Sequence, residues 1–183
     1  MIVRLAVAED AAAIAAIYAP YVTQSAVSFE AEAPGVEEMR ARIAAGGALY
    51  PWLVAEEGGA LLGYASASAF RARHAYRFTV ETSVYVRDGG QRRGVGGALY
   101  SALLPLLGRQ GFTQAIAALT LPNDASVKLH ERHGFARAGA YENVGHKFGE
   151  WRSVGLWQRA LAPLVADPAE PQPFALLWAD QRP

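Results

Sequence analysis

The chain contains no cysteine. This absence excludes disulfide bonds, thiolate metal sites and a cysteine nucleophile, so any acyl transfer must proceed without an acyl-cysteine intermediate. Long apolar runs are also missing, because none approaches the roughly 18 residues that are needed to cross a bilayer. The first residues lack the charged and apolar regions of an export signal. We therefore expect a cytoplasmic protein with no membrane partner.

Charge of one sign is not in excess either. Lys and Arg together number 17, as do Asp and Glu, so no global positive field attracts nucleic acid. Hydrophobic residues make up 52% of the chain and charged residues 19%, which is typical of a soluble globular protein. At 183 residues one domain is expected over residues 1–162. Residues 163–183 are expected to form a proline-containing arm whose apolar tip docks on this domain or on a second copy.

Hydrophobic periodicity predicts a protein of mixed helices and strands. Strands are expected at residues 2–6, 52–55, 61–65, 79–86, 115–121, 136–148 and 151–161, with a glycine turn over residues 56–59. Helices are expected at residues 9–22, from Pro34 onward, after residue 94, and from Asn123 or Asp124 to Gly134. Pro34 suits the first turn of its helix. Pro105 lacks a backbone N–H group and is expected to bend its helix or end it early, and Gly111 to stop it.

Residues 91–97 have the sequence QRRGVGG and connect a predicted strand to a predicted helix. Backbone amides can converge on a phosphate group there, because glycine permits close approach and a helix N-terminus carries about half a positive charge. A Walker A loop would end in Gly-Lys-Ser/Thr, and a dinucleotide fingerprint needs a third glycine where Leu99 stands. The remaining pattern is Gln/Arg-x-x-Gly-x-Gly/Ala, matched by Gln91, Gly94 and Gly96. This pattern favours a diphosphate site.

The same pattern is the acetyl-CoA diphosphate motif of the GNAT superfamily. From about residue 2 to residue 161 the chain resembles the phosphinothricin and methionine-sulfoximine acetyltransferase branch of that superfamily. The stretches that carry the resemblance are 50–56 (YPWLVAE), 72–76 (ARHAY), 79–86 (TVETSVYV), 121–127 (LPNDASV) and 147–151 (KFGEW). The resemblance implies an α/β fold with a central, mixed, mostly antiparallel and splayed sheet flanked by helices. It also implies acetyl-CoA as co-substrate, no metal ion, and a homodimer.

The resemblance assigns the cofactor to two segments. The main chain of Val84, Tyr85 and Val86 is expected to pair with the pantetheine arm as an added strand would. The diphosphate is expected at a set of seven residues, and Asn123 is expected to contact the cofactor as well. The seven are Gln91, Arg92, Arg93, Gly94, Val95, Gly96 and Gly97. Solvent-exposed loop arginines are the alternative for Arg92 and Arg93, and helix capping is the alternative for Asn123.

Two residues are expected to move protons. An amine acceptor arrives protonated and must lose a proton before it attacks, and Glu81 is the expected base. An ion pair with a nearby arginine is its alternative role. His130 matches a position where the wider superfamily often has a tyrosine that protonates the departing thiolate. Whether His130 acts as acid or base stays open, and a purely structural histidine is the alternative.

The acceptor implied by the resemblance is the free α-amino group of a small amino-acid-like molecule. Arg71, Arg73 and Tyr76 are expected to bind its carboxylate and a second polar group, because guanidinium groups match carboxylates. Phe29, in the loop over residues 23–33, is expected to wall the pocket. A surface role for the arginines is the alternative. Acetylation of another amine, such as a protein N-terminus or an antibiotic, and a non-catalytic acyl-CoA-binding module are the competing functions.

Overall fold

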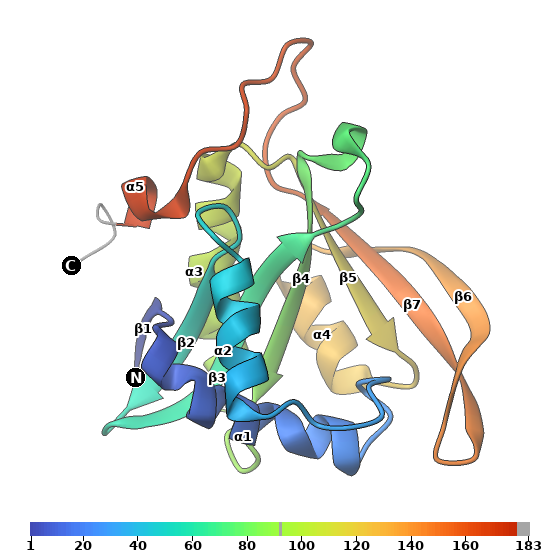
Figure 1. Ribbon diagram of the computed structural model, residues 1–183. Helices are drawn as coiled ribbons and strands as arrows, with labels where there is room; N and C mark the ends of the chain where they lie inside the picture. Colours follow the sequence, from blue (N-terminus) through green and yellow to red (C-terminus); the bar gives the residue numbers. More distant parts are fainter. Residues whose placement is uncertain (92, 179–183) are drawn as a thin grey trace.

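The computed structural model describes residues 1–91 and 93–178 of the chain. They form one seven-stranded sheet with helices on both faces (Figure 1). The strands are β1 (Ile2–Leu5), β2 (Trp52–Glu57), β3 (Ala60–Ala69), β4 (Thr79–Val86), β5 (Gln114–Thr120), β6 (Ala136–Lys147) and β7 (Glu150–Ala160). Their order in the sheet is β1-β2-β3-β4-β5-β7-β6. Only β4 and β5 pair in parallel, so the predicted mixed, mostly antiparallel sheet is confirmed.

The helices form two layers. They are η1 (Ala8–Asp10), α1 (Ala11–Thr23), α2 (Val36–Ala45), η2 (His74–Tyr76), α3 (Val95–Gln110), α4 (Asp124–Arg132) and α5 (Phe174–Trp178). In Figure 1, α1 and α2 lie in front of the sheet, while α3 and α4 lie behind it. The sheet is therefore covered on both faces.

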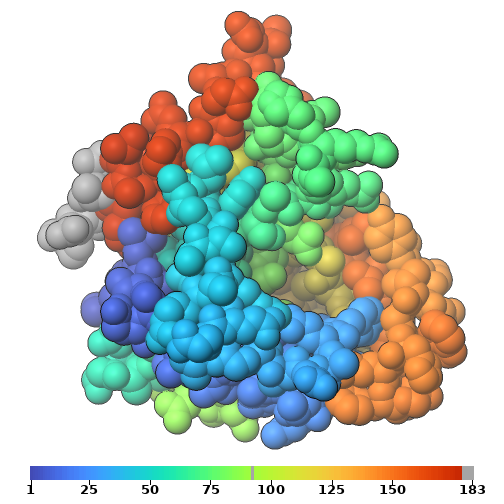
Figure 2. Space-filling model, viewed as in Figure 1, coloured from blue at the N-terminus to red at the C-terminus, as the bar shows by residue number. Residues whose placement is uncertain are grey.

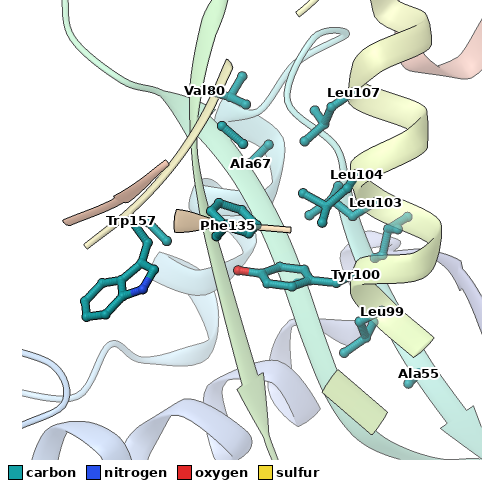
Figure 3. Packing of buried hydrophobic residues seen from close by; sticks show 14 of the residues in the cluster. Ala55, Ala67, Val80, Leu99, Tyr100, Leu103, Leu104, Leu107, Phe135 and Trp157 are labelled. Atoms are coloured by element: carbon teal, nitrogen blue, oxygen red, sulfur yellow. The ribbon is translucent and has the colours of Figure 1, made fainter. Parts of the chain in front are cut away.

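Strand alternation divides the core between these layers. Leu53 and Ala55 of β2 join the cluster that contains α3, whereas Val54 between them joins the cluster that contains α1. Successive side chains of a strand point to opposite faces, so this is the pattern that a sheet covered on both sides requires. The α3 layer packs a row of leucines against the strands (Figure 3). Each fully buried leucine side chain contributes about 1.5–3 kcal/mol.

Prolines interrupt the helices less than the sequence predicts. Pro34 precedes Gly35, the residue that caps α2, so its predicted place in the first turn is wrong. Pro105 lies inside α3, which continues to Gln110, so this helix does not end early. Leu106 and Leu107 are fully buried just beyond it, and their burial offsets the lost hydrogen bond. Gly111, with φ of 103°, ends α3 as predicted.

The β2–β3 hairpin has the predicted glycine turn, though a shorter one. Gly58 and Gly59 both have positive φ, at 58° and 79°, which is typical of tight hairpin turns. Glu56 and Glu57, predicted as part of the turn, instead extend β2. The extra length places Glu57 in β2, where it forms an ion pair with Arg93 of the glycine segment.

The C-terminal segment folds back onto α3. The Gln110 side-chain amide donates to the carbonyls of Leu49 and Gln172 at 2.9 and 2.8 Å. Phe174 N donates to Ala48 O at 3.0 Å, and Trp178 packs against the α3 core. The apolar tip thus docks on the same chain. In the part of the chain that the structure describes, no helix is both long and apolar enough to span a membrane.

Candidate active site

The sheet opens between β4 and β5. The two strands pair only from Thr79 to Glu81, opposite residues 114–116, and then diverge toward their carboxyl ends (Figure 1). On its other side β4 stays paired with β3 as far as Val86. Within the described chain, residues 82–86 of β4 therefore have no ladder partner on the β5 side. Unpaired backbone groups at such an edge can accept an added strand-like ligand.

The residues predicted to hold pantetheine lie along this open edge. Val84 and Val86 pack toward the α3 layer, and Tyr85 packs on the opposite face. The Tyr85 ring lies 4.9 Å from that of Tyr18 and 5.0 Å from that of Tyr21. The Val86 carbonyl already accepts a 2.6 Å hydrogen bond from the Tyr21 hydroxyl. The strand is thus held in place by aromatic packing on the face away from α3.

Glu81 occupies the last paired position of β4 before the opening. Its side chain is half-buried, and within the described chain it forms neither an ion pair nor a hydrogen bond. This removes the alternative role of a partner for the nearby arginines. Burial raises the pKa of the Glu81 carboxyl above its ordinary value of 4.5. A carboxylate with a raised pKa beside an opening is the expected property of a general base.

The glycine segment ends at the N-terminus of α3, as predicted. Gly94 caps the helix with φ of 79°, and among the described residues no side chain bonds to the amides of the first turn. These amides belong to Val95, Gly96 and Gly97, which have no intrahelical acceptors at this end of a helix. A Cβ at Gly94 would point into open space. The segment therefore presents free donors that fit an anionic group.

Other residues of this segment have different local roles. Val95 is buried, and a Cβ on Gly63 would lie 2.9 Å from its Cγ1. A Cβ on Gly96 would lie 2.9 Å from Leu129 of α4. The Val95 side chain and the lack of a side chain at Gly96 thus serve packing, while the backbone amides of both residues remain available to a ligand.

The polar side chains of the segment are engaged within the chain. Gln91 accepts a 2.9 Å hydrogen bond from Gly89 N. Arg93 forms an exposed ion pair with Glu57, a contact worth little in solvent. Arg92, predicted to reach a phosphate, lies outside the described residues.

Asn123 caps α4, so its alternative role is present. Its side-chain oxygen accepts a 3.2 Å hydrogen bond from Ser126 N. Asn123 also borders a pocket of about 500 Å³, which Val127 and Ser153 line as well. A cap and a ligand contact are compatible, because an amide side chain also carries donors that the cap does not use.

His130 is buried, with an exposed fraction of 1%. Its Nδ1 lies 2.7 Å from the Ser126 carbonyl oxygen, and its Nε2 lies 2.8 Å from the Tyr100 hydroxyl. A carbonyl only accepts, so Nδ1 carries the proton and Tyr100 donates to Nε2. Burial lowers the pKa of His130, which favours this neutral form. The sequence analysis expects His130 to move a proton, whereas here both nitrogens are bonded inside the protein.

Tyr100 connects His130 to the strand that carries Glu81. Its side chain projects from α3 toward the sheet beside Phe135 (Figure 3), and its hydroxyl lies 3.4 Å from Thr82 Oγ1. Tyr100 is missed by the sequence analysis. A tyrosine within a buried leucine row is the available signal, because its hydroxyl requires a partner there.

The predicted acceptor residues lie at the β3–β4 connection, beside Glu81. Ser68 pairs with Glu81, and the connection that follows β3 holds Arg71, Arg73 and Tyr76. The Arg71 guanidinium stacks on Tyr76, 5.7 Å from the ring centroid. Arg71 and Arg73 are exposed, and neither forms an ion pair within the described residues. Two cations without a carboxylate partner therefore lie in the connection that leads into the paired end of β4.

Phe29 lies on the α1–α2 loop that covers the same side of the sheet. The Thr120 hydroxyl at the end of β5 donates to Val27 O at 3.1 Å, which brings this loop over the strands. Figure 2 shows a hollow on this side, between the α1–α2 segment (blue), the β3–β4 connection (green) and the β6–β7 hairpin (orange). The hollow is the room available to an acceptor.

Comparisons with known proteins point to the same family as the sequence motifs. Residues 3–153 match the acetyltransferase (GNAT) domain family. A phosphinothricin N-acetyltransferase of Streptomyces viridochromogenes is 42% identical over 157 residues, covering 86% of each chain. An L-methionine sulfoximine/L-methionine sulfone acetyltransferase of Salmonella typhimurium is 36% identical over 162 residues, covering 88% of this chain and 95% of that one. The crystal structure of a phosphinothricin acetyltransferase from Sinorhizobium meliloti with AcCoA has a TM-score of 0.88 and 38% identity, covering 92% and 93%.

The chain belongs to the GNAT acetyltransferase family. It is an acetyl-CoA-dependent N-acetyltransferase, which confirms the resemblance and the enzyme class predicted from the sequence. The GNAT fold is confirmed as well. The assignment of the β4 edge and of the amides at the start of α3 to two parts of acetyl-CoA stays a prediction.

A second residue of this GNAT chain that the sequence analysis misses is Lys147. Its ammonium group donates to the carbonyls of Val22, Ser28 and Glu30 at 2.6, 2.6 and 2.8 Å. The only signal is its place in the stretch 147–151, one of those that carry the family resemblance. These partners lie more than 100 residues away in sequence, so spacing alone does not reveal them.

Proposed function

We propose that the enzyme transfers the acetyl group of acetyl-CoA to the free α-amino group of a small amino-acid-like acceptor of the phosphinothricin, methionine sulfoximine or methionine sulfone type. Transfer is direct, within a ternary complex. The observation that carries the proposal is Glu81, a half-buried carboxylate without a partner at the opening between β4 and β5. The relatives named above act on acceptors of this type, which supports the same class here.

Glu81 takes the proton from the ammonium group of the acceptor, directly or through one water molecule. Its raised pKa suits the task, because a base works best when its pKa approaches the working pH. The freed amine then bonds to the acetyl carbonyl carbon, and the carbon–sulfur bond breaks with release of the CoA thiolate. The proton that the nitrogen loses as the amide forms passes to this thiolate, directly or through water. No cysteine is present to carry the acetyl group, which favours direct transfer.

The cofactor residues hold two parts of acetyl-CoA, the amide-containing pantetheine arm and the anionic diphosphate. The edge of β4 from Val84 to Val86 pairs with the pantetheine arm. The amides of Val95, Gly96 and Gly97 receive the diphosphate, and Asn123 adds a contact from the start of α4. An amide at the β4 edge also stabilises negative charge on the thioester oxygen during attack.

The acceptor is oriented by cations and an apolar wall. Arg71 and Arg73 bind its carboxylate, since planar guanidinium groups match carboxylates. Tyr76 supports Arg71 by stacking, and Phe29 closes the apolar side. A polyamine or an aminoglycoside would instead require an acidic pocket.

His130 receives a supporting role in this proposal. Its neutral ring bonds through both nitrogens to Ser126 and Tyr100, so it has no proton to give from Nε2. It holds α4, and with it Asn123, against α3 and β4. We therefore assign His130 as a positioning residue, in place of the acid or base role expected from the sequence.

The test is a free-thiol release assay with acetyl-CoA. The acceptor panel contains methionine sulfoximine, methionine sulfone, phosphinothricin, common amino acids, a polyamine and an aminoglycoside. Rapid turnover of the first three, lost in Glu81→Gln, supports the proposal. Turnover only of the polyamine or aminoglycoside points to another amine, and acetyl-CoA binding without any turnover points to a binding module.

Two further predictions concern the assembly and the location of the enzyme. We propose that it forms a homodimer through the β6–β7 hairpin, where the large side chains of Tyr141, Val144, Phe148 and Trp151 are exposed. Light scattering of the wild type and of Trp151→Glu tests this, and an unchanged dimer in the variant contradicts the assigned surface. The cytoplasmic location stays a prediction that cell fractionation checks.

A further inference from the structure

The α1–α2 loop is fixed to the distant β6–β7 hairpin by Lys147. An ammonium group has three N–H donors, and here all three bond to backbone carbonyls, that of Val22 in the last turn of α1 and those of Ser28 and Glu30 in the loop. A neutral amine has only two donors, so this arrangement requires the charged form. Charged hydrogen bonds are the stronger kind. Lys147 thus joins the end of α1 and the middle of the loop at one point.

Other elements hold the same loop from different sides. The Tyr18 hydroxyl of α1 contacts Ser28 Oγ at 2.7 Å and donates to Glu30 Oε1 at 2.9 Å. Arg42 of α2 binds Glu30 through two parallel hydrogen bonds of 2.7 and 2.8 Å. Thr120 of β5 adds the bond to Val27 described above. The loop backbone therefore has one position, although its apolar residue Phe29 is exposed.

Phe29 rests on the hairpin at a glycine. A Cβ at Gly145 would lie 2.8 Å from Cδ2 of the Phe29 ring and closer still to Cε2 and Cζ. The ring therefore occupies the space that any side chain at residue 145 would need. Gly145 lies two residues before Lys147 on β6, so one short stretch of the hairpin fixes both the loop backbone and the ring.

We propose that Lys147 and Gly145 are positioning residues that determine acceptor specificity by fixing Phe29 as one wall of the acceptor pocket. This inference rests on the proposed function, since it concerns the acceptor side of that same site. The fixed ring selects acceptors with a compact, unbranched side chain. A displaced ring binds them less well and admits bulkier amino acids. Among the described residues, the contacts of Lys147 and Gly145 outside the β6–β7 hairpin are with α1 and the α1–α2 loop, so the reaction itself and acetyl-CoA binding are left intact.

Hydrogen exchange tests the loop without any substrate. In Lys147→Met, amides of residues 22–33 should exchange about tenfold faster or more than in the wild type, because three charged hydrogen bonds to this segment are lost. Lys147→Arg should restore only part of the protection, because a planar fork cannot bond to three carbonyls around one point. Lys128→Met, which removes an exposed lysine from α4, is the matched control and should leave the loop unchanged.

Kinetics then test specificity in a double-mutant cycle. Gly145→Ala should raise the acceptor KM several-fold, because its methyl group displaces the exposed ring, while the acetyl-CoA KM and kcat stay within about twofold. Phe29→Ala should raise the acceptor KM to a similar extent and improve turnover of bulkier amino acids. In the Phe29→Ala background, adding Gly145→Ala should have no further effect, because the ring it displaces is gone.

The outcomes separate this inference from the proposed function. If the effects of Gly145→Ala and Phe29→Ala on the acceptor KM multiply in the double variant, the specificity role is wrong. A rise in the acetyl-CoA KM equal to that of the acceptor KM would overturn it as well. Unchanged loop exchange in Lys147→Met would overturn the positioning role. A wild-type enzyme that acetylates none of the small acceptors would contradict the proposed function, and the exchange data would still decide whether Lys147 fixes the loop.

Discussion

The two sides of the opening between β4 and β5 are built in different ways. The cofactor side comes from one continuous segment, in which β4, the glycine segment and α3 follow each other between residues 79 and 110. The acceptor side is assembled from the α1–α2 loop, the β3–β4 connection and the β6–β7 hairpin. One of its bonds, from Lys147 to Val22, joins residues 125 positions apart.

This difference separates binding of the donor from choice of the acceptor. The cofactor side uses backbone groups and glycines, which depend little on distant residues. The acceptor side uses side chains whose positions depend on long-range contacts. Substitutions on one side should therefore change the kinetic constants of one substrate only, and substitutions between the sides should change turnover.

The largest effect is expected where the two sides meet, at Glu81. Glu81→Gln removes the proposed base and should lower kcat by about 10²–10⁴-fold, the usual contribution of a general base. Binding of acetyl-CoA, measured by calorimetry, should not change. In the wild type, kcat/KM should fall as the pH decreases through the raised pKa of Glu81, and the variant should lack this limb. A variant that keeps most of its turnover would remove Glu81 from the reaction.

Glu81→Gln should lower the activity of the enzyme but raise its stability. Because the folded pKa of Glu81 is raised above 4.5, the folded protein binds a proton in a pH window where the unfolded chain has lost it. Stability therefore decreases as the pH rises through that window and stays at the lower level above it. Gln removes this cost, and the Tm of the variant at neutral pH should exceed that of the wild type by about 1–2 °C.

Tyr100 and His130 form a buried, hydrogen-bonded pair. Substitutions of these residues test whether they act only by positioning other groups. Tyr100→Phe leaves the buried Nε2 of His130 without its donor and should lower the free energy of unfolding by about 1–3 kcal/mol. The kcat should fall by about tenfold, which corresponds to about 1.4 kcal/mol, with the acceptor KM unchanged. The acetyl-CoA KM should rise, because α4 carries Asn123. Denaturant titration and steady-state kinetics measure the two effects.

The pH profile distinguishes positioning from acid–base catalysis at this pair. In Tyr100→Phe and in His130→Asn the acid limb assigned to Glu81 should persist, because the base is intact. Loss of a limb in His130→Asn would show instead that the imidazole moves a proton in the reaction, as the sequence analysis expects.

The cofactor side is tested at Gly94. A residue with a Cβ is strained by about 1–2 kcal/mol in the left-handed conformation that Gly94 adopts. Gly94→Ala should disturb the first turn of α3 and raise the acetyl-CoA KM by about tenfold, with the acceptor KM unchanged. Gly35→Ala is the matched control, because φ is −72° there and nothing lies near the added Cβ. Equal effects on both KM values would contradict the separation of the two sides.

The sequence predicts the cofactor side better than the acceptor side. The strand, glycine segment and helix from residue 79 onward are predicted because each depends on local pattern and on helix-terminus chemistry. The positions of Phe29 and Lys147 are not, because they arise when the hairpin folds over the loop. His130 shows a further limit, since the family resemblance marks the residue but burial and the Tyr100 hydroxyl decide which partners its ring has.

The smallest effect is expected at Asn123, where one side chain has two proposed roles. Asn123→Ala removes the cap of α4 and should cost about 1 kcal/mol, or about 2–4 °C in Tm. Asn123→Ser keeps a cap acceptor but has no amide to offer a ligand. A capping role alone predicts that serine restores both the Tm and the acetyl-CoA KM. The proposed contact predicts that serine restores the Tm while the KM stays raised, so Asn123 belongs to the cofactor side only if these two measurements separate.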